Sequence, residues 1–341
     1  MKPNTHRTLK AFCTSRRHAL IRMGLVGMLA SGVTPAALAQ APAAYPERAV
    51  KIVVPFAPGA GTDAMGRLVA QKLGEIMKAT FVVDNKAGAS GAIGTQFVAQ
   101  APADGYTLLL VASPFTTVAA SVPTANYDPL RQFAPVGMVA TGPLVWATNA
   151  ALPVADMKEL VRLARQKPGV LNYGSAGAGG VNHLVLELLK SRTGTFITHI
   201  PYRGIAPATM DMIGGQIQLV TGTIPALLPL VKDGRIKPLA VTSARRSSAL
   251  PDTPSMAESG FPGIDVVNYF ALMAPAGTPE PVITALNSAI NKLVVLPEVV
   301  ARFKLDAVEA APGSPALLGS FLEADYRAWR NVVITQNLKI E

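Results

Sequence analysis

Short apolar runs alternate with amphipathic stretches along most of the chain. The apolar run at 51–54 precedes a helical pattern at 63–77, in which Met65, Val69 and Leu73 recur on one face. Further strands are predicted at 80–83, 106–112, 144–148, 170–173, 196–200, 216–221, 237–242 and 267–273. Further helices are predicted at 92–100, 154–166, 182–190, 207–213, 225–231, 279–293 and 314–334. The alternation predicts an α/β protein with a largely parallel sheet covered by helices on both faces.

Length and composition allow two domains. The chain has 341 residues, enough for two ordinary globular units. Its composition shifts near Pro143, where a second α/β unit is predicted to begin. The stretch at 247–262 is rich in proline and small polar residues, which predicts a loop.

The first 39 residues differ from the rest of the chain. They carry six basic residues and no acidic one, followed by an apolar run at 23–38 that ends in Ala-Leu-Ala. This order is typical of a secretory signal peptide cleaved after Ala39. A membrane anchor is the alternative, although the run is short and rich in small residues. Arg16 and Arg17 also fit a twin-arginine signal, so the choice between the two export routes stays open.

Removing this segment changes the charge of the chain. Of 31 basic residues 25 remain, against 21 acidic ones, so the net charge falls from +10 to about +4. We therefore expect no nucleic-acid partner. Cys13, the single cysteine, also lies in the segment, which excludes disulfides and cysteine-based metal sites from the predicted mature protein.

Polar turns containing small residues follow four of the predicted strands. The turn at 55–63 contains two prolines and two glycines before a helix that Thr62 or Asp63 would cap. Its exposed backbone N–H groups and the helix dipole would favour an anion. The other three turns follow Val83, Val111 and Tyr173. Because ligands bind at the carboxyl ends of strands in open α/β sheets, we expect the four turns to share one cleft.

The sequence lacks the motifs of several catalytic classes. It contains no P-loop, no complete dinucleotide fingerprint and no G-x-S-x-G elbow, so we predict no cofactor. Outside the first 39 residues its histidines are His183 and His199, which have no second metal-type ligand at helical spacing, so no metal site is predicted. An exported hydrolase with Ser175 or Ser113 as nucleophile stays an alternative.

Three side chains each allow two interpretations. His183 either lines the cleft as a hydrogen-bond donor or fixes the glycine-rich loop at 174–180 by bonding to the backbone of that loop. Arg203 either pairs with a ligand carboxylate or is a surface arginine at a strand end. Asp63 is expected to cap a helix, because a carboxylate repels an anionic ligand unless an ammonium group or a water intervenes.

Five segments together resemble the Bug-type solute-binding receptors of tripartite tricarboxylate transporters. They are the segments at 54–63, 83–91, 173–184, 200–204 and 274–279. The resemblance extends from Tyr45 to the terminal helix. The chain departs from the usual family pattern at Ala60, where a glycine is typical, and at 269–271, where Tyr-Phe-Ala replaces tryptophan, an aromatic residue and glycine.

The resemblance implies a type II periplasmic binding protein fold, with two α/β domains, crossover strands and a ligand cleft between the domains. Domain 1 is expected at 40–145 plus 268–341 and domain 2 at 146–267. The implied role is capture of a small carboxylate, such as a dicarboxylate, a tricarboxylate, an acidic amino acid or an aromatic acid, in the periplasm for delivery to a membrane permease, without enzymatic activity. A sensor subunit that uses the same closure stays an alternative, and a monomer is expected.

The resemblance also implies specific ligand contacts. Carried onto this chain, they are Phe56, Ala57, Gly61, Thr62, Asp63, Ser113, Ser175, Gly177, Gly179 and His183. Arg203 joins them as the candidate for pairing with a carboxylate.

Overall fold

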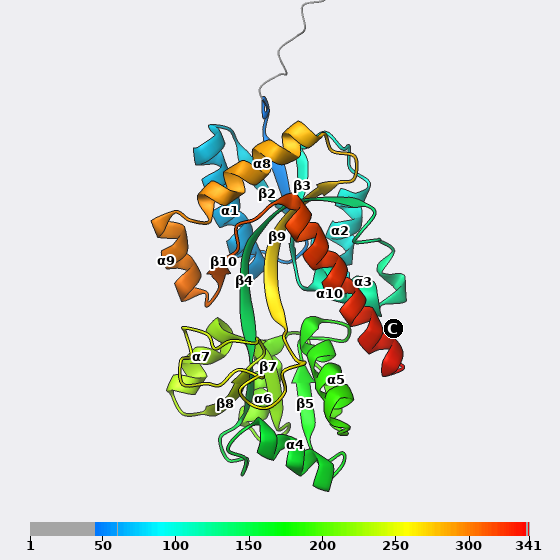
Figure 1. Ribbon diagram of the computed structural model, residues 1–341, viewed down its shortest axis with the longest axis vertical. Helices are drawn as coiled ribbons and strands as arrows, with labels where there is room; N and C mark the ends of the chain where they lie inside the picture. The colour runs from blue at the N-terminus through cyan, green and yellow to red at the C-terminus, as the bar shows by residue number, and fades with distance from the viewer. Residues whose placement is uncertain (1–44, 60, 339, 341) are drawn as a thin grey trace, which may run out of the picture. The chain divides into compact units, whose positions relative to one another are not determined.

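The computed structural model describes residues 45–59, 61–338 and 340. The expected signal peptide, its cleavage site, Cys13 and the family departure at Ala60 lie outside the described residues. The described chain contains two sheets, each covered by helices, which we call lobe 1 and lobe 2 (Figure 1).

Lobe 1 is built on the sheet that contains the first three strands. Its strands are β1 (Val50–Val54), β2 (Phe81–Asn85), β3 (Thr107–Ala112), β9 (Val267–Pro275), the first part of β4 (Phe133–Asn149) and β10 (Glu309–Ala310). They lie in the order β2-β1-β3-β9-β4-β10, in which β1 is parallel to β2 and β3 and the remaining neighbours are antiparallel. Strand β1 pairs with a strand on each side and is covered by helices on both faces. Because both of its faces are buried, its sequence is nearly continuously apolar.

Helices cover both faces of the lobe 1 sheet. One face carries α1 (Gly61–Met77), α8 (Glu280–Leu293) and α9 (Pro297–Leu305). The other carries α2 (Ala92–Ala99), α3 (Pro114–Ser121) and the first half of α10 (Pro315–Thr335), with short 3-10 turns at Ala89–Gly91 and Pro123–Ala125. Met65, Val69 and Leu73 lie on the face of α1 that is buried against the sheet, which confirms the helical face predicted from their spacing.

Lobe 2 is built on the second sheet. Its strands are β8 (Ile236–Val241), the end of β4, β7 (Leu219–Thr223), β5 (Asn172–Ser175) and β6 (Thr198–Pro201), in that order across the sheet. Strands β7, β5 and β6 are parallel to one another, whereas β4 is antiparallel to both of its neighbours. The helices are α4 (Met157–Gln166) and α5 (Val181–Thr193) on one face, with α6 (Ile205–Ile213) and α7 (Ile224–Lys232) on the other.

Three segments of the described chain connect the lobes. β4 is 17 residues long and pairs in both sheets. β9 returns from lobe 2, where the N–H of Val266 still bonds to the carbonyl of Thr242. α10 packs against lobe 1 through Leu318 and against the core of lobe 2 through Trp329 (Figure 1). The predicted domain boundaries near 145 and 267 fall inside β4 and at the start of β9.

The prediction of a largely parallel sheet is wrong, because the crossing strands β4 and β9 make every pairing in which they take part antiparallel. The sequence pattern identified only the end of β4. Its first part contains Pro135, Gly137 and Gly142, residues that usually interrupt strands. Two register shifts, between Pro135 and Gly137 and between Met138 and Ala140, accommodate them.

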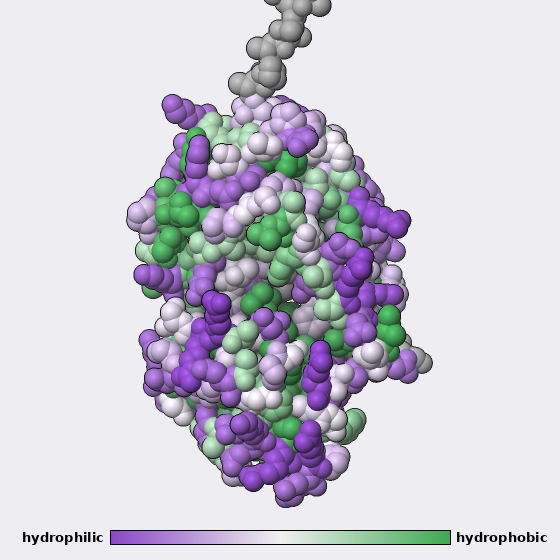
Figure 2. Space-filling view, in the orientation of Figure 1, coloured by the Kyte–Doolittle hydropathy of each residue, from purple (hydrophilic) through white to green (hydrophobic). Residues whose placement is uncertain are grey.

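The surface mixes polar and apolar residues. On the face shown in Figure 2, hydrophobic residues form small groups between polar ones. Within the described ranges no single helix is long and apolar enough to cross a membrane; α8 and α9 reach that length and hydropathy only together, and they meet at a bend of 73°.

Candidate functional site

A cavity of about 190 Å³ lies between the lobes. Lobe 1 contributes the turns after β1 and β3 to its lining, and lobe 2 contributes the turns after β5 and β7. Its lining contains hydroxyl, amide and apolar groups and no charged side chain. The polar side chains in the lining are Thr62, Ser113, Asn182, Thr223 and Asn268.

Five helices begin at this cavity. The residues that line it include the first turns or N-caps of α1, α3, α5, α6 and α7, represented by Thr62, Ser113, Asn182, Ile205 and Thr223. The first N–H groups of a helix have no partner inside the helix and carry partial positive charge. Each such end favours an anion by roughly 0.3–1 kcal/mol. The site therefore favours a small anion without using a charged side chain.

Asn268 and Ser113 form a polar pair at the start of β9. The Oγ of Ser113 donates to Oδ1 of Asn268 at 2.7 Å, and the backbone N–H of Ser113 points at the same atom at 3.4 Å. Because an N–H needs an acceptor, these contacts assign this atom as the amide oxygen. The Nδ2 group of Asn268 makes no hydrogen bond to a described residue, so two N–H donors are available in the cavity.

Asp63 holds the first turn in place. Its carboxylate accepts hydrogen bonds from the N–H of Gly59 at 2.9 Å, Nε of Arg67 at 3.0 Å and Nδ2 of Asn85 at 2.9 Å. These hydrogen bonds, the one from Gly59 foremost, lower the pKa of Asp63 to about 2. Asn85 also donates to the carbonyl of Phe56 at 3.0 Å. The turn after β2 thus supports the first turn and does not itself line the cavity, contrary to the expected convergence of four turns.

Two stacked histidines hold the glycine-rich loop of lobe 2. Nδ1 of His183 accepts from the N–H of Gly179 at 3.1 Å, and its ring lies 3.8 Å from the ring of His199. The Oγ of Ser175 is 2.6 Å from Nε2 of His199 and also bonds to the backbone of Gly177. Burial, aided by the charge of Lys190, lowers the pKa of His183 to about 4. Burial and the neighbouring His183 lower the pKa of His199 to about 3.

The contact between Ser175 and His199 does not form a working nucleophile. Ser175 is fully buried and does not line the cavity. Among the described residues no carboxylate hydrogen-bonds to His199 to orient it, as a catalytic triad requires. The other candidate nucleophile, Ser113, bonds to Asn268, which is not a base.

The structure brings together three of the sequence-predicted site residues, Phe56, Thr62 and Ser113, around the cavity. Gly61 lines a second cavity beside it. Four further residues, Ser175, Gly177, Gly179 and His183, form hydrogen bonds within the glycine-rich loop and its helix and do not line the cavity. Asp63 likewise bonds within the first turn, to Gly59. Ala57 and Arg203 are exposed and do not line the cavity, and Arg203 makes no ion pair with a described residue.

Three polar residues of the lining were not identified from the sequence: Asn182, Thr223 and Asn268. Thr223 precedes Ile224 and Pro225, and a threonine followed by a proline two residues later is a signal for a helix start that could have found it. Asn268 is a single polar residue at the start of the apolar strand β9, and its partner Ser113 is 155 positions away in the chain.

These features together define a class of protein: a periplasmic binding protein, in which two α/β lobes joined by crossing strands hold a small ligand between them. Residues 65–338 match the family model described as the tripartite tricarboxylate transporter family receptor. The chain belongs to this family, which confirms the resemblance and the fold class predicted from sequence. Because the family consists of transport receptors, the chain is a solute-binding protein and not an enzyme.

Relatives and solved structures agree with this assignment. The chain is 36% identical to the protein BugT of Bordetella pertussis over 299 residues, which cover 87% of this chain and 92% of BugT. It resembles the structure of Rpa4515 from R. palustris with adipate, with a TM-score of 0.76 and 37% identity over 87% of this chain and 99% of that one. It also resembles MatC from Rhodopseudomonas palustris with bound malate, with a TM-score of 0.74 and 28% identity over 85% of this chain and 100% of that one.

Proposed function

We propose that this receptor captures a small carboxylate in the cavity between its lobes and delivers it to the membrane permease of a tripartite tricarboxylate transporter. One observation carries the proposal: five helices begin at a cavity that has hydroxyl and amide donors and no acidic side chain in its lining. The adipate and malate bound by two structural relatives support a carboxylate as the anion.

Binding is proposed to draw the lobes together. A ligand shifts a conformational equilibrium only if it binds one state better than the other, and contacts on both lobes provide that difference. Thr62 would supply them from lobe 1, and Thr223 from lobe 2. The lobes then correspond to the two predicted domains, which move about β4 near 145 and the start of β9.

Export completes the proposal. Residues 1–39 are proposed to direct the chain to the periplasm by the general secretory or the twin-arginine route and to be removed there. The periplasmic assignment of structural relatives supports this location.

Thermal unfolding tests the function directly. The purified protein is unfolded and refolded to remove bound ligand, then heated with succinate, malate, adipate, glutamate, nicotinate or benzoate, each paired with its neutral amide. A true ligand at 100 times its dissociation constant adds about 2.7 kcal/mol to the unfolding free energy, a shift of several degrees. A rise with an acid and none with its amide is expected. Equal responses to acid and amide, or no response to any acid, would contradict the proposal.

Removing one donor should weaken binding. For Thr62→Ala we expect about a tenfold loss of affinity, because a hydrogen bond to a charged group contributes roughly 1.5 kcal/mol. Calorimetric titration with the acid found above measures this loss. The control is Thr80→Ala, since Thr80 is exposed and lies outside the cavity. Equal affinity of both variants would remove Thr62 from the site.

A further inference from the structure

A second cavity adjoins the cavity between the lobes. Asn268 and Thr223 line both cavities, and the neighbouring residues Gly61 and Thr62 line one cavity each. The second cavity has a volume of about 140 Å³. We call it the apolar annex, because its lining is mostly hydrocarbon, from Met65, Pro143, Ile224, Pro225, Phe270 and Val308. A ligand held at the helix N-termini can therefore extend into apolar surroundings.

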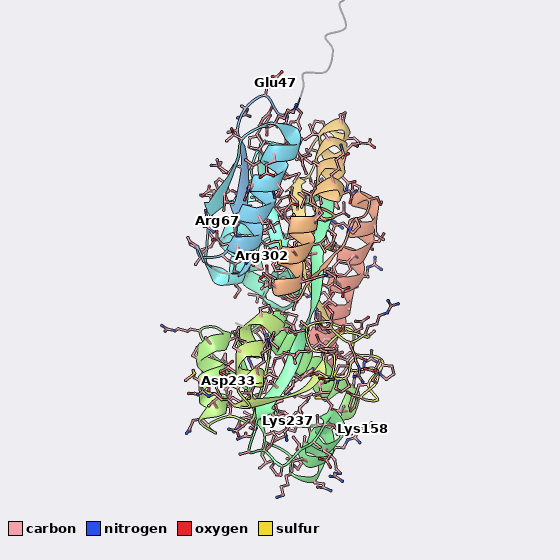
Figure 3. All side chains as sticks on the ribbon, turned by 90° about the vertical axis from the view of Figure 1, so that its left-hand side faces the viewer. Glu47, Arg67, Lys158, Asp233, Lys237 and Arg302 are labelled. Atoms are coloured by element: carbon pink, nitrogen blue, oxygen red, sulfur yellow. The ribbon has the colours of Figure 1, made fainter. Side chains whose placement is uncertain are left out.

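The annex offers no unpaired charge among the described residues. Its two charged side chains are Arg302 and Asp306 on α9 and just after it, and they bond to each other, with Nε of Arg302 2.8 Å from Oδ2 of Asp306. Figure 3 shows Arg302 at the end of lobe 1 that faces lobe 2. A ligand carboxylate in the annex would face the carboxylate of Asp306 as well as the guanidinium of Arg302, so this neutral pair offers it little net attraction. A second negative charge therefore gains little there, whereas a hydrocarbon group gains from contact with the apolar lining.

The main cavity provides for one carboxylate. Its free donors are neutral: the amide of Asn268, the hydroxyls of Thr62 and Thr223, and backbone N–H groups at the helix starts. The hydroxyl of Ser113 is already committed to Asn268, and the amide of Asn182 to the carbonyl of Thr221. These groups suit a single anionic end. Apolar cavities of about 150 Å³ bind benzene, so the annex has the size for one six-membered ring.

We propose that this receptor prefers monocarboxylates that carry a six-membered hydrocarbon ring, with the carboxylate at the helix N-termini and the ring in the apolar annex. The inference rests on the proposed carboxylate-binding function. It assigns Ala64, Met65, Phe270 and Val308 to the recognition of the ligand body. It distinguishes this chain from a receptor that recognises two acidic ends of a ligand.

Calorimetric titration of the refolded protein tests the preference. Benzoate and cyclohexanecarboxylate are compared with acetate, which has the same charge and no ring, and with adipate and malate, which have two acidic ends. We expect both ring acids to bind at least tenfold more tightly than acetate, adipate and malate. This comparison uses the unaltered protein, so it does not depend on the folding of any variant.

A variant that fills the annex tests the location. Ala64 is exposed on α1 and lines the annex, so Ala64→Phe places a ring where the ligand ring would lie. Benzoate should bind at least tenfold more weakly to this variant, whereas acetate affinity should change less than twofold. The control is Ala301→Phe, because Ala301 is exposed on α9 and does not line the annex. It should leave both affinities unchanged.

The outcomes separate the inference from the function on which it rests. Tighter binding of adipate or malate than of the ring acids, or unchanged benzoate affinity of Ala64→Phe, would overturn the annex as a ring site and leave a carboxylate receptor. Failure of every carboxylate to bind would overturn the proposed function as well.

Discussion

Replacing Asp63 by asparagine tests whether this carboxylate is a support of the binding loop or a ligand contact. Asp63 is buried, with 5% of its side chain exposed, and it accepts three hydrogen bonds. Its pKa falls from 3.8 to about 2 on folding. A fall in pKa of this size corresponds to about 2 kcal/mol of stability at pH 7.

The sign of the pH dependence follows from the lowered pKa. Stabilisation by a carboxyl group whose pKa falls on folding is fully present above its unfolded pKa of 3.8 and is lost as the pH falls through about 2. At pH 7 the unfolding free energy of Asp63→Asn should therefore be lower than that of the unaltered protein by about 2 kcal/mol, and at pH 3 this deficit should be roughly half as large. Urea unfolding followed by circular dichroism at the two pH values measures both deficits.

Asp252→Asn is the matched control, because Asp252 is exposed and makes no hydrogen bond to a described residue. It should change the unfolding free energy by less than about 0.5 kcal/mol. A deficit for Asp63→Asn that is absent at pH 7, or that stays constant between pH 7 and pH 3, would refute the reasoning. Loss of ligand affinity with unchanged stability would show instead that Asp63 contacts the ligand.

Three further changes probe lobe 2 and the pair at β9. The pKa of His183 falls from 6.5 to about 4 on folding, so the unfolded chain takes up the proton first and stability falls as the pH drops through 6.5. Between pH 7.5 and pH 5 this loss is about 2 kcal/mol, and urea unfolding of His183→Gln should show a pH dependence smaller by that amount. In Gly179→Ala the added Cβ would lie 2.9 Å from Ser121 and Val122 at a φ of +76°, so thermal unfolding should show a loss of at least about 1 kcal/mol. This loss should exceed that of the control Gly180→Ala, whose added Cβ has its nearest neighbour at 3.9 Å and whose φ is −75°. Ser113→Ala should lower ligand affinity about fivefold in calorimetric titration by releasing the amide of Asn268, and it should have no further effect in Asn268→Ala.

The sequence predicted helices and strands well where residues close together in the chain determine them. The apolar spacing of α1 was sufficient to place this helix, because helix periodicity acts over a few residues. The predicted cap was wrong, since α1 begins at Gly61 and both Thr62 and Asp63 lie inside its first turn. The first part of β4 was missed, since Pro135 and Gly137 look like breaks until bulges pair them with β9. The segment that became α3 was predicted only as a strand end.

The roles of site residues depend on partners that are distant in the chain. The sequence allows two interpretations for His183, and the structure supports the one in which it holds the glycine-rich loop, through Gly179. Asp63 is not the expected helix cap; it lies within α1 and holds the preceding turn, with Asn85 as a partner. The distance from Asp63 to Asn85 along the chain shows why spacing alone could not decide between cap and ligand. Asn268 faces the cavity because β9 re-enters lobe 1 beside β3, and this crossing has no local signal.

The packing of α10 on both lobes has a mechanical consequence. Leu322 belongs to a core of lobe 1 and Val332 to the core of lobe 2, and ten residues of α-helix separate them by about 15 Å. A straight helix cannot shorten, so the lobes cannot approach by simple translation along it. Any closing motion must instead rotate one lobe around this rod or slide its side chains against the rod. Under the proposed closure, the free energy of ligand binding would therefore include the work of repacking a helix that does not line the cavity.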